Sequence, residues 1–189
     1  SETGELQTQE TDDDGNVKEE ATTLADVVDN MDGFGRDTRV RYDTPRWNGL
    51  QLRTSVVNDG AVDAAVFYEE EIGPVEVDAA FGWANLGDAS ENATFDDLFA
   101  GSASFLHESG VNLTLAGGTQ TRRAAAGDDP VFYYAKLGYQ RDFFAFGKTA
   151  LSVDVHQTND QQEEGDEAWA IGFQSVQDVD DWGVDAVFN

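Results

Sequence analysis

The chain has 189 residues, no cysteine and a formal net charge of −27, from 38 acidic and 11 basic residues. This charge argues against nucleic-acid binding, because phosphate groups would be repelled, and the lack of cysteine excludes disulfides and thiolate metal sites. Aromatic residues make up 11% of the chain, which argues against disorder throughout.

Residues 1–35 form a strongly acidic segment in which Lys18 is the only basic residue. Within it, Leu24, Val27, Val28 and Met31 recur at helical spacing. The segment is therefore predicted to be a long acidic loop that contains one short helix.

From Thr38 onward, ten segments alternate between apolar and polar residues, which predicts β-strands. Short turns alternate with longer loops between them, except at Asp59-Gly60. In chain order the predicted strands are Thr38–Pro45, Leu50–Asn58, Ala61–Glu70, Val75–Asn85, Leu98–His107, Val111–Thr121, Val131–Gln140, Gly147–Gln157, Glu167–Gln177 and Trp182–Asn189.

Each predicted strand has one apolar face and one face of charged, small or amide side chains. Alternation alone fits a soluble β-sandwich as well as a membrane barrel. Three details favour the barrel: turn lengths alternate, aromatic residues gather near strand ends, and the apolar faces carry few charges. We therefore expect an all-β, antiparallel transmembrane β-barrel with meander topology.

Several segments resemble the general porins of Gram-negative bacteria, over most of the chain from Arg36 onward. The segment Arg39–Pro45 followed by Trp47–Leu50 resembles the porin sequence after the constriction loop. Porin-like hairpin segments also occur, at Gly101–Glu108 with Gly110–Thr114, at Tyr134–Tyr139 and at Gly147–Ala150.

This resemblance implies a sixteen-stranded, trimeric outer-membrane barrel whose third loop folds inward and faces arginines on the wall. Residues 1–35 would then be the inward constriction loop and residues 36–189 the barrel strands. Ten strands are fewer than sixteen, so the resemblance implies an internal portion of a longer chain, with strands before Ser1 and after Asn189. A small closed barrel of ten strands is the alternative.

The resemblance also implies the residues of the pore constriction. The basic wall would be Arg39, Arg41 and Arg53, and the facing acidic loop residues would be Asp26, Asp29 and Asp32. The clustered arginines either set up a transverse field across the lumen or simply pair with neighbouring strand acids. Further candidate lumen residues, which extend the basic wall or balance one another, are Lys136, Lys148 and Asp154.

The expected function is that of a porin: passive diffusion of small hydrophilic solutes and ions, with a preference for cations. The expected location is the outer membrane of a Gram-negative bacterium, with lipid and lipopolysaccharide around a homotrimer. No cofactor is expected, and no enzyme activity, because neither His107 nor His156 has a nucleophile at a recognisable spacing. The alternative is a non-conducting structural or adhesive surface β-protein.

Overall fold

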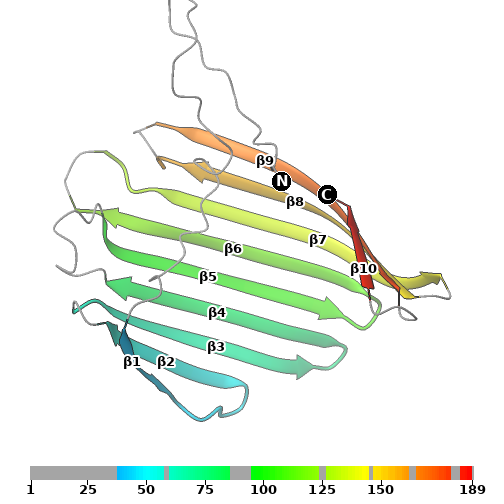
Figure 1. The fold of residues 1–189 in the computed structure, drawn as a ribbon, viewed down its shortest axis with the longest axis horizontal. Coiled ribbons are helices and arrows are strands. Elements are labelled where there is room, and N and C mark those ends of the chain that lie inside the picture. The colour runs from blue at the N-terminus through cyan, green and yellow to red at the C-terminus, as the bar shows by residue number, and fades with distance from the viewer. Residues whose placement is uncertain are drawn as a thin grey trace, which may run out of the picture.

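The computed structural model describes residues 38–57, 60–85, 95–123, 127–144, 147–161, 165–179 and 184–188. These residues form ten β-strands (Figure 1). The strands are β1 (Arg39–Asp43), β2 (Leu50–Val57), β3 (Val62–Ile72), β4 (Val75–Asn85), β5 (Phe95–His107), β6 (Val111–Arg122), β7 (Val131–Phe144), β8 (Gly147–Asn159), β9 (Glu167–Val179) and β10 (Val184–Phe188).

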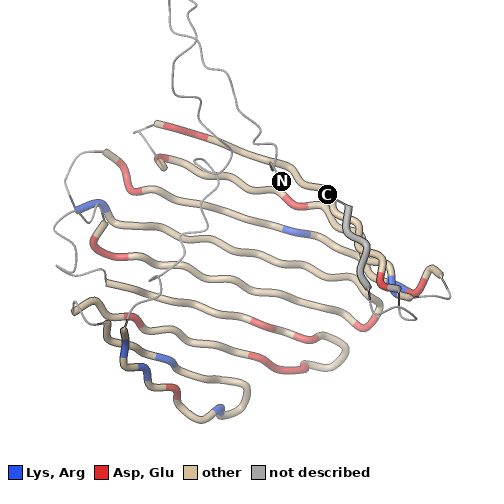
Figure 2. Tube along the Cα trace, in the orientation of Figure 1, with Lys and Arg blue, Asp and Glu red and all other residues tan. Residues whose placement is uncertain are grey.

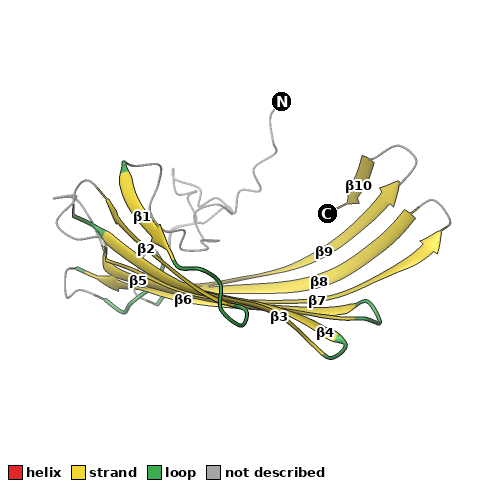
Figure 3. Cartoon of the chain, turned by 90° about the horizontal axis from the view of Figure 1, so that it is seen from below, coloured by secondary structure: helices red, strands yellow, loops and turns green. Residues whose placement is uncertain are grey.

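The strands form one sheet in the order β1 to β10, and each strand pairs antiparallel with the next. The predicted all-β antiparallel meander of about ten strands is confirmed. The sheet is curved into a trough (Figure 3). Within the described ranges β1 and β10 are its two edges, so it is not closed into a barrel. The same ranges contain no helix long and apolar enough to cross a membrane.

Residues paired across neighbouring strands lie on the same face, because side chains alternate along a strand. This places most of the exposed large hydrophobic side chains on one face, the apolar face, from 37% exposed at Phe99 to 79% at Val40. Its other members include Tyr42, Leu50, Leu52, Val56, Val66, Ile72, Phe81, Phe105, Val111, Leu113, Leu115, Tyr133, Leu137, Leu151, Val153, Val155, Trp169, Ile171 and Phe173.

The opposite face, the polar face, carries charged, hydroxyl, amide and small side chains. The described buried cluster also lies here and is small, formed by Ala84, Leu98 and Phe132. The facing of the strand that contains Leu98 was not evident from the sequence, and the structure places Leu98 on the polar face, 6% exposed. The described residues thus form a single layer whose apolar face is open.

The predicted turns use residues suited to left-handed backbone. Asn48 and Gly49 have φ of 46° and 79°, and Trp47 and Leu50 exchange backbone hydrogen bonds of 2.8 and 2.9 Å. An Asn-Gly pair with two positive φ angles is the preferred chemistry of a type I′ turn. The tight turn predicted at Pro45–Gly49 is confirmed.

Two predicted boundaries differ from the structure by three residues or more. The strand predicted over Val131–Gln140 ends too early, because β7 continues to Phe144, with a register shift between Arg141 and Phe144. An irregular pair breaks the two-residue alternation on which the prediction depends. β5 also begins at Phe95, earlier than the predicted Leu98. The predicted acidic loop 1–35 and its helix lie outside the described residues.

Candidate functional site

The predicted basic wall lies together on the polar face. Arg41 pairs in register with Ser55, and Asp43 pairs with Arg53, which places Arg39, Arg41 and Arg53 on one side of the β1–β2 hairpin. Figure 2 shows the basic residues gathered on these two strands. The sequence order of the arginines becomes a spatial cluster because the hairpin folds β2 back along β1.

Strand acids hold this cluster. Arg41 donates two hydrogen bonds to Asp43, each of 2.6 Å. The Nε atom of Arg53 lies 3.7 Å from Asp43 Oδ2. The Nη1 atom of Arg39 lies 3.9 Å from Asp63 Oδ2, which also accepts a 2.6 Å hydrogen bond from Ser55. These are the contacts expected of strand arginines that pair with neighbouring acids.

Arg53 also has aromatic and amide contacts. Its guanidinium carbon lies 4.0 Å from the ring centroid of Phe67 on β3, within the range of a cation–π interaction. Its Nε and Nη2 donate hydrogen bonds of 3.1 and 2.9 Å to the Gln51 side chain. A guanidinium fixed by a ring, an amide and a carboxylate keeps one orientation on the polar face.

The acids predicted to face this wall, Asp26, Asp29 and Asp32, lie outside the described residues. Sequence reasoning did not assign Asp43 or Asp63 to the site. Their signal was available in the register, because a strand acid opposite a strand arginine becomes visible once the intervening turn is fixed.

Lys136, Lys148 and Asp154 also lie on the polar face. Lys136 and Asp154 are direct partners in the β7–β8 register, but no ion pair joins them among the described contacts. The Asp154 carboxylate lies over Gly172 of β9. A Cβ atom added at Gly172 would lie 2.7 and 2.8 Å from the two carboxylate oxygens of Asp154. Asp154 Oδ1 is shielded from solvent and has no hydrogen-bond partner in the described part of the chain.

Four carboxylates form a second charged group, the acidic quartet, at the turn end of β3 and β4 (Figure 2). Glu69 faces Asp78, and Glu71 faces Glu76, in direct register. Like charges in directly opposed positions destabilise a sheet. An ion pair from Arg46 to Glu69 offsets one of these charges. The arrangement concentrates negative potential where the β3–β4 turn meets the polar face.

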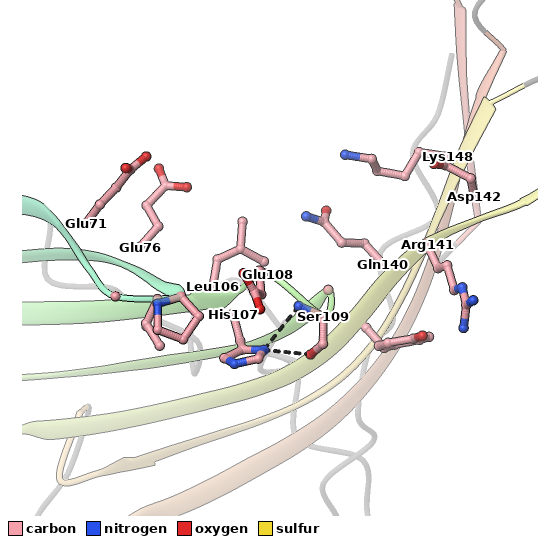
Figure 4. Close-up of a pocket in the computed structure, with 15 residues that line it drawn as sticks. Glu71, Glu76, Leu106, His107, Glu108, Ser109, Gln140, Arg141, Asp142 and Lys148 are labelled. Carbon is pink, nitrogen blue, oxygen red and sulfur yellow. Dashed lines mark hydrogen bonds between the residues drawn. The ribbon is translucent and has the colours of Figure 1, made fainter.

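Three hollows lie at this turn end and along the polar face. The first, of about 780 Å³, lies at the turn ends of the strands and is lined from both faces, by charged residues that include Glu71, Glu76, Arg141 and Lys148 (Figure 4). In Figure 4, Gln140 and Lys148 point to the side toward which the sheet curves, and Arg141 points to the opposite side. The polar face is therefore the concave face of the trough.

The second hollow, of about 330 Å³, lies next to the first, and the two share Glu76, Leu106 and Gln140. The third hollow, of about 530 Å³, lies further along β4 to β7. The side chains that line it are Ala80, Ala100, Ser102, Ala116, Phe132 and Tyr134.

The apolar face has aromatic residues toward both ends of its strands. At one end Trp83 pairs in register with Phe99, and the Trp83 indole donates a 2.9 Å hydrogen bond to Asp97. Trp169 is exposed at the same end, beside the β8–β9 connection. At the other end Tyr42 is exposed, and Phe143 packs edge to face against Tyr139, with ring centroids 6.1 Å apart. The rings flank a band of aliphatic side chains.

No protein-family model matches this sequence, and neither a curated protein nor a solved structure shows significant similarity to it.

Proposed function

We propose that the sheet is part of the wall of an outer-membrane pore of the general-porin type, through which small hydrophilic solutes and ions diffuse passively. The observation that carries this proposal is the open apolar face. Apolar surface is favoured in a non-aqueous environment by about 25 cal/mol per Å². Contiguous exposed apolar patches of this kind mark membrane or partner contacts, and lipid would cover the whole of this face.

The strand lengths and the aromatic residues support a membrane. A tilted transmembrane strand needs about 9–11 residues, and β3 to β9 have 11 to 14. On β7, the aromatic residues Tyr133 and Tyr139 flank Leu137 on the apolar face, an arrangement that is typical of aromatic residues bordering an apolar band. A bonded indole such as Trp83 suits the membrane interface, which is partly apolar and partly wet.

The polar face is suited to a water-filled lumen. Its arginine cluster and its acidic quartet lie on different strands, β1–β2 and β3–β4, so charge of both signs faces the same space. We propose cation preference, because the quartet places part of the chain's net charge of −27 on the polar face. The trimer, the lipopolysaccharide contact and the Gram-negative location follow from the porin resemblance and belong to the same proposal.

The test is ion conduction by the full chain, folded in detergent and added to a planar lipid bilayer. We expect stepwise conductance and, under a salt gradient, a reversal potential that indicates cation preference. A chain that inserts but never conducts would be a non-conducting surface β-protein, and a chain that stays soluble and monomeric without detergent would not be an outer-membrane protein. A reversal potential that indicates anion preference would contradict the proposed cation preference.

A further inference from the structure

We propose that the polar face carries a binding track for neutral saccharides on β4 to β9, formed by the second and third hollows. The inference rests on the proposed function, since it requires the concave side of the sheet to be filled with water. It goes further by assigning a solute class to residues outside the arginine cluster.

The second hollow provides hydroxyl and amide side chains that can hydrogen-bond to a saccharide. Hydroxyl and amide side chains both donate and accept, and so do the hydroxyls of a saccharide. Two of them, Ser104 and Thr114, lie 3.1 Å apart across β5 and β6. The hydroxyl and amide residues that line this hollow are Ser104, Asn112, Thr114, Gln140, Ser152 and Gln174.

The third hollow provides a flat apolar surface with an aromatic wall. Ala80, Ala100 and Ala116 come from three adjacent strands, so short side chains leave the backbone layer nearly bare. Tyr134 stands beside this surface and packs against the buried cluster that contains Phe132, which is 4% exposed. Both rings meet the His156 ring edge to face, with centroids 5.8 Å away for Phe132 and 6.3 Å away for Tyr134. Packing against His156 fixes the wall, which can receive the C–H face of a sugar ring.

The two hollows form one continuous surface. On β5, β6 and β7, one alternate step on the same face leads from a residue of the third hollow to a residue of the second: Ser102 to Ser104, Ala116 to Thr114, and Tyr134 to Lys136. Such a step is about 7 Å along a strand. A saccharide of two rings can therefore place one ring on the alanine surface and the other among the hydroxyl and amide groups.

Charge disfavours an anionic solute at this position. Lys136 lines the second hollow on β7, whereas Glu76 and Asp78 line it on β4. Two carboxylates against one ammonium group leave a net negative charge, which repels an anion. A neutral saccharide avoids this repulsion and can still accept a hydrogen bond from the lysine and donate to the carboxylates.

The test is calorimetric titration of the full chain, folded in detergent micelles, with sucrose. Glucose, glucosamine and glucuronate serve as neutral, cationic and anionic single-ring sugars. We expect saturable sucrose binding, weaker binding of glucuronate than of glucose or glucosamine, and about a tenfold loss of sucrose affinity in Tyr134→Ala. Tyr133→Ala is the matched control, because Tyr133 is the adjacent residue on the apolar face, and it should leave the affinity unchanged.

A second variant separates binding from folding. Tyr134→Phe keeps the ring and should retain most of the affinity, and heat-modifiable migration reports whether each variant is folded. Equal sucrose affinity in the folded Tyr134→Ala and Tyr133→Ala proteins overturns the track, and so does the absence of sucrose binding by a chain that conducts ions. Absence of conductance overturns the proposed pore, and the calorimetric comparison then still decides the saccharide site.

Discussion

Arg53, in the predicted basic wall, contacts an aromatic ring, an amide and a carboxylate. It faces the Phe67 ring at 4.0 Å, donates to Gln51 and lies 3.7 Å from Asp43. A planar guanidinium satisfies ring, amide and carboxylate together, which an ammonium group does not. Arg53 is therefore held in place on the polar face, where its charge contributes to the electrostatic potential on the concave side of the sheet.

Replacing this charge should raise the cation preference of the pore. In Arg53→Gln the lumen loses a positive charge, so the reversal potential under a salt gradient should shift further toward the cation value. Arg141→Gln is the control, because Arg141 points away from the concave side (Figure 4). Equal shifts in the two variants, or none in either, would contradict the placement of Arg53 in a conducting lumen.

Single residues of the site could be predicted only in part. The clustering of Arg39, Arg41 and Arg53 is visible in the sequence, because all three have the polar parity of their strands. Their contacts with Asp63 and Phe67 were not, because these depend on the registers of β1 with β2 and of β2 with β3. The register is set by turn geometry, and residues far apart in sequence meet only once it is known.

At the scale of elements, β6 gives a direct comparison of the two faces. Leu115 lies on the apolar face and is 44% exposed, and Thr114 beside it lines the second hollow of the polar face. Lysine on the lipid face of a barrel strand costs about 2–4 kcal/mol near the bilayer midplane, whereas lumen positions accept it. In water, lysine at an exposed leucine would cost little.

Leu115→Lys should therefore lower the free energy of unfolding in lipid by about 2–4 kcal/mol. Thr114→Lys, which places a like charge opposite Lys136, should lower it by only about 0.2–1 kcal/mol. Urea unfolding of the protein in lipid vesicles, followed by tryptophan fluorescence, measures both. A Leu115→Lys protein as stable as Thr114→Lys would mean that the apolar face does not meet lipid.

The hairpins depend on particular glycines. Gly110, in the β5–β6 turn, has φ of 91°, and an added Cβ would lie 1.9 Å from the Gln140 carbonyl oxygen. Gly73, in the β3–β4 turn, has φ of 61° but open space around it. Gly73→Ala should cost about 1–2 kcal/mol from the left-handed backbone alone. Gly110→Ala should cost more, because the backbone of β7 must also move.

Urea midpoints of these two variants, measured in the same vesicles, test this ranking. If Gly73→Ala proved the more destabilising substitution, the close approach of the β5–β6 turn to β7 would be wrong. The main-chain hydrogen bond from Gln140 N to Gly110 O, 2.9 Å long, is the contact expected to break.

All ten elements could be predicted because apolar alternation is a local signal, and Val75–Asn85 was found with its observed bounds. Apolar alternation fails to mark the end of β7. There the register with β8 shifts after Arg141, so the side chains that follow no longer keep the alternation of the rest of the strand. The alternation also misses the start of β5, because Phe95 lies on the far side of another register shift, before Asp97.

At the scale of the whole molecule, the described strands form a single layer with an apolar face on one side and a polar face on the other. The acidic quartet shows that the polar face is not arranged for stability alone, since Glu69 and Asp78 face each other and so do Glu71 and Glu76. Their pairing could be obtained by counting outward from the Gly73-Pro74 turn. The negative potential of the quartet, at the turn end of β3 and β4, attracts cations, and this attraction depends on ionic strength.

The cation preference should therefore weaken with salt and with neutralisation of the quartet. The Debye length falls from about 10 Å at 0.1 M salt to about 3 Å at 1 M, so the same salt ratio should give a smaller reversal potential at the higher concentration. Glu76→Gln with Asp78→Asn should reduce the low-salt reversal potential toward the high-salt value. Glu70→Gln, on the opposite face of β3, should leave it unchanged. A reversal potential that is insensitive to both salt and the double substitution would show that the quartet does not face the ion path.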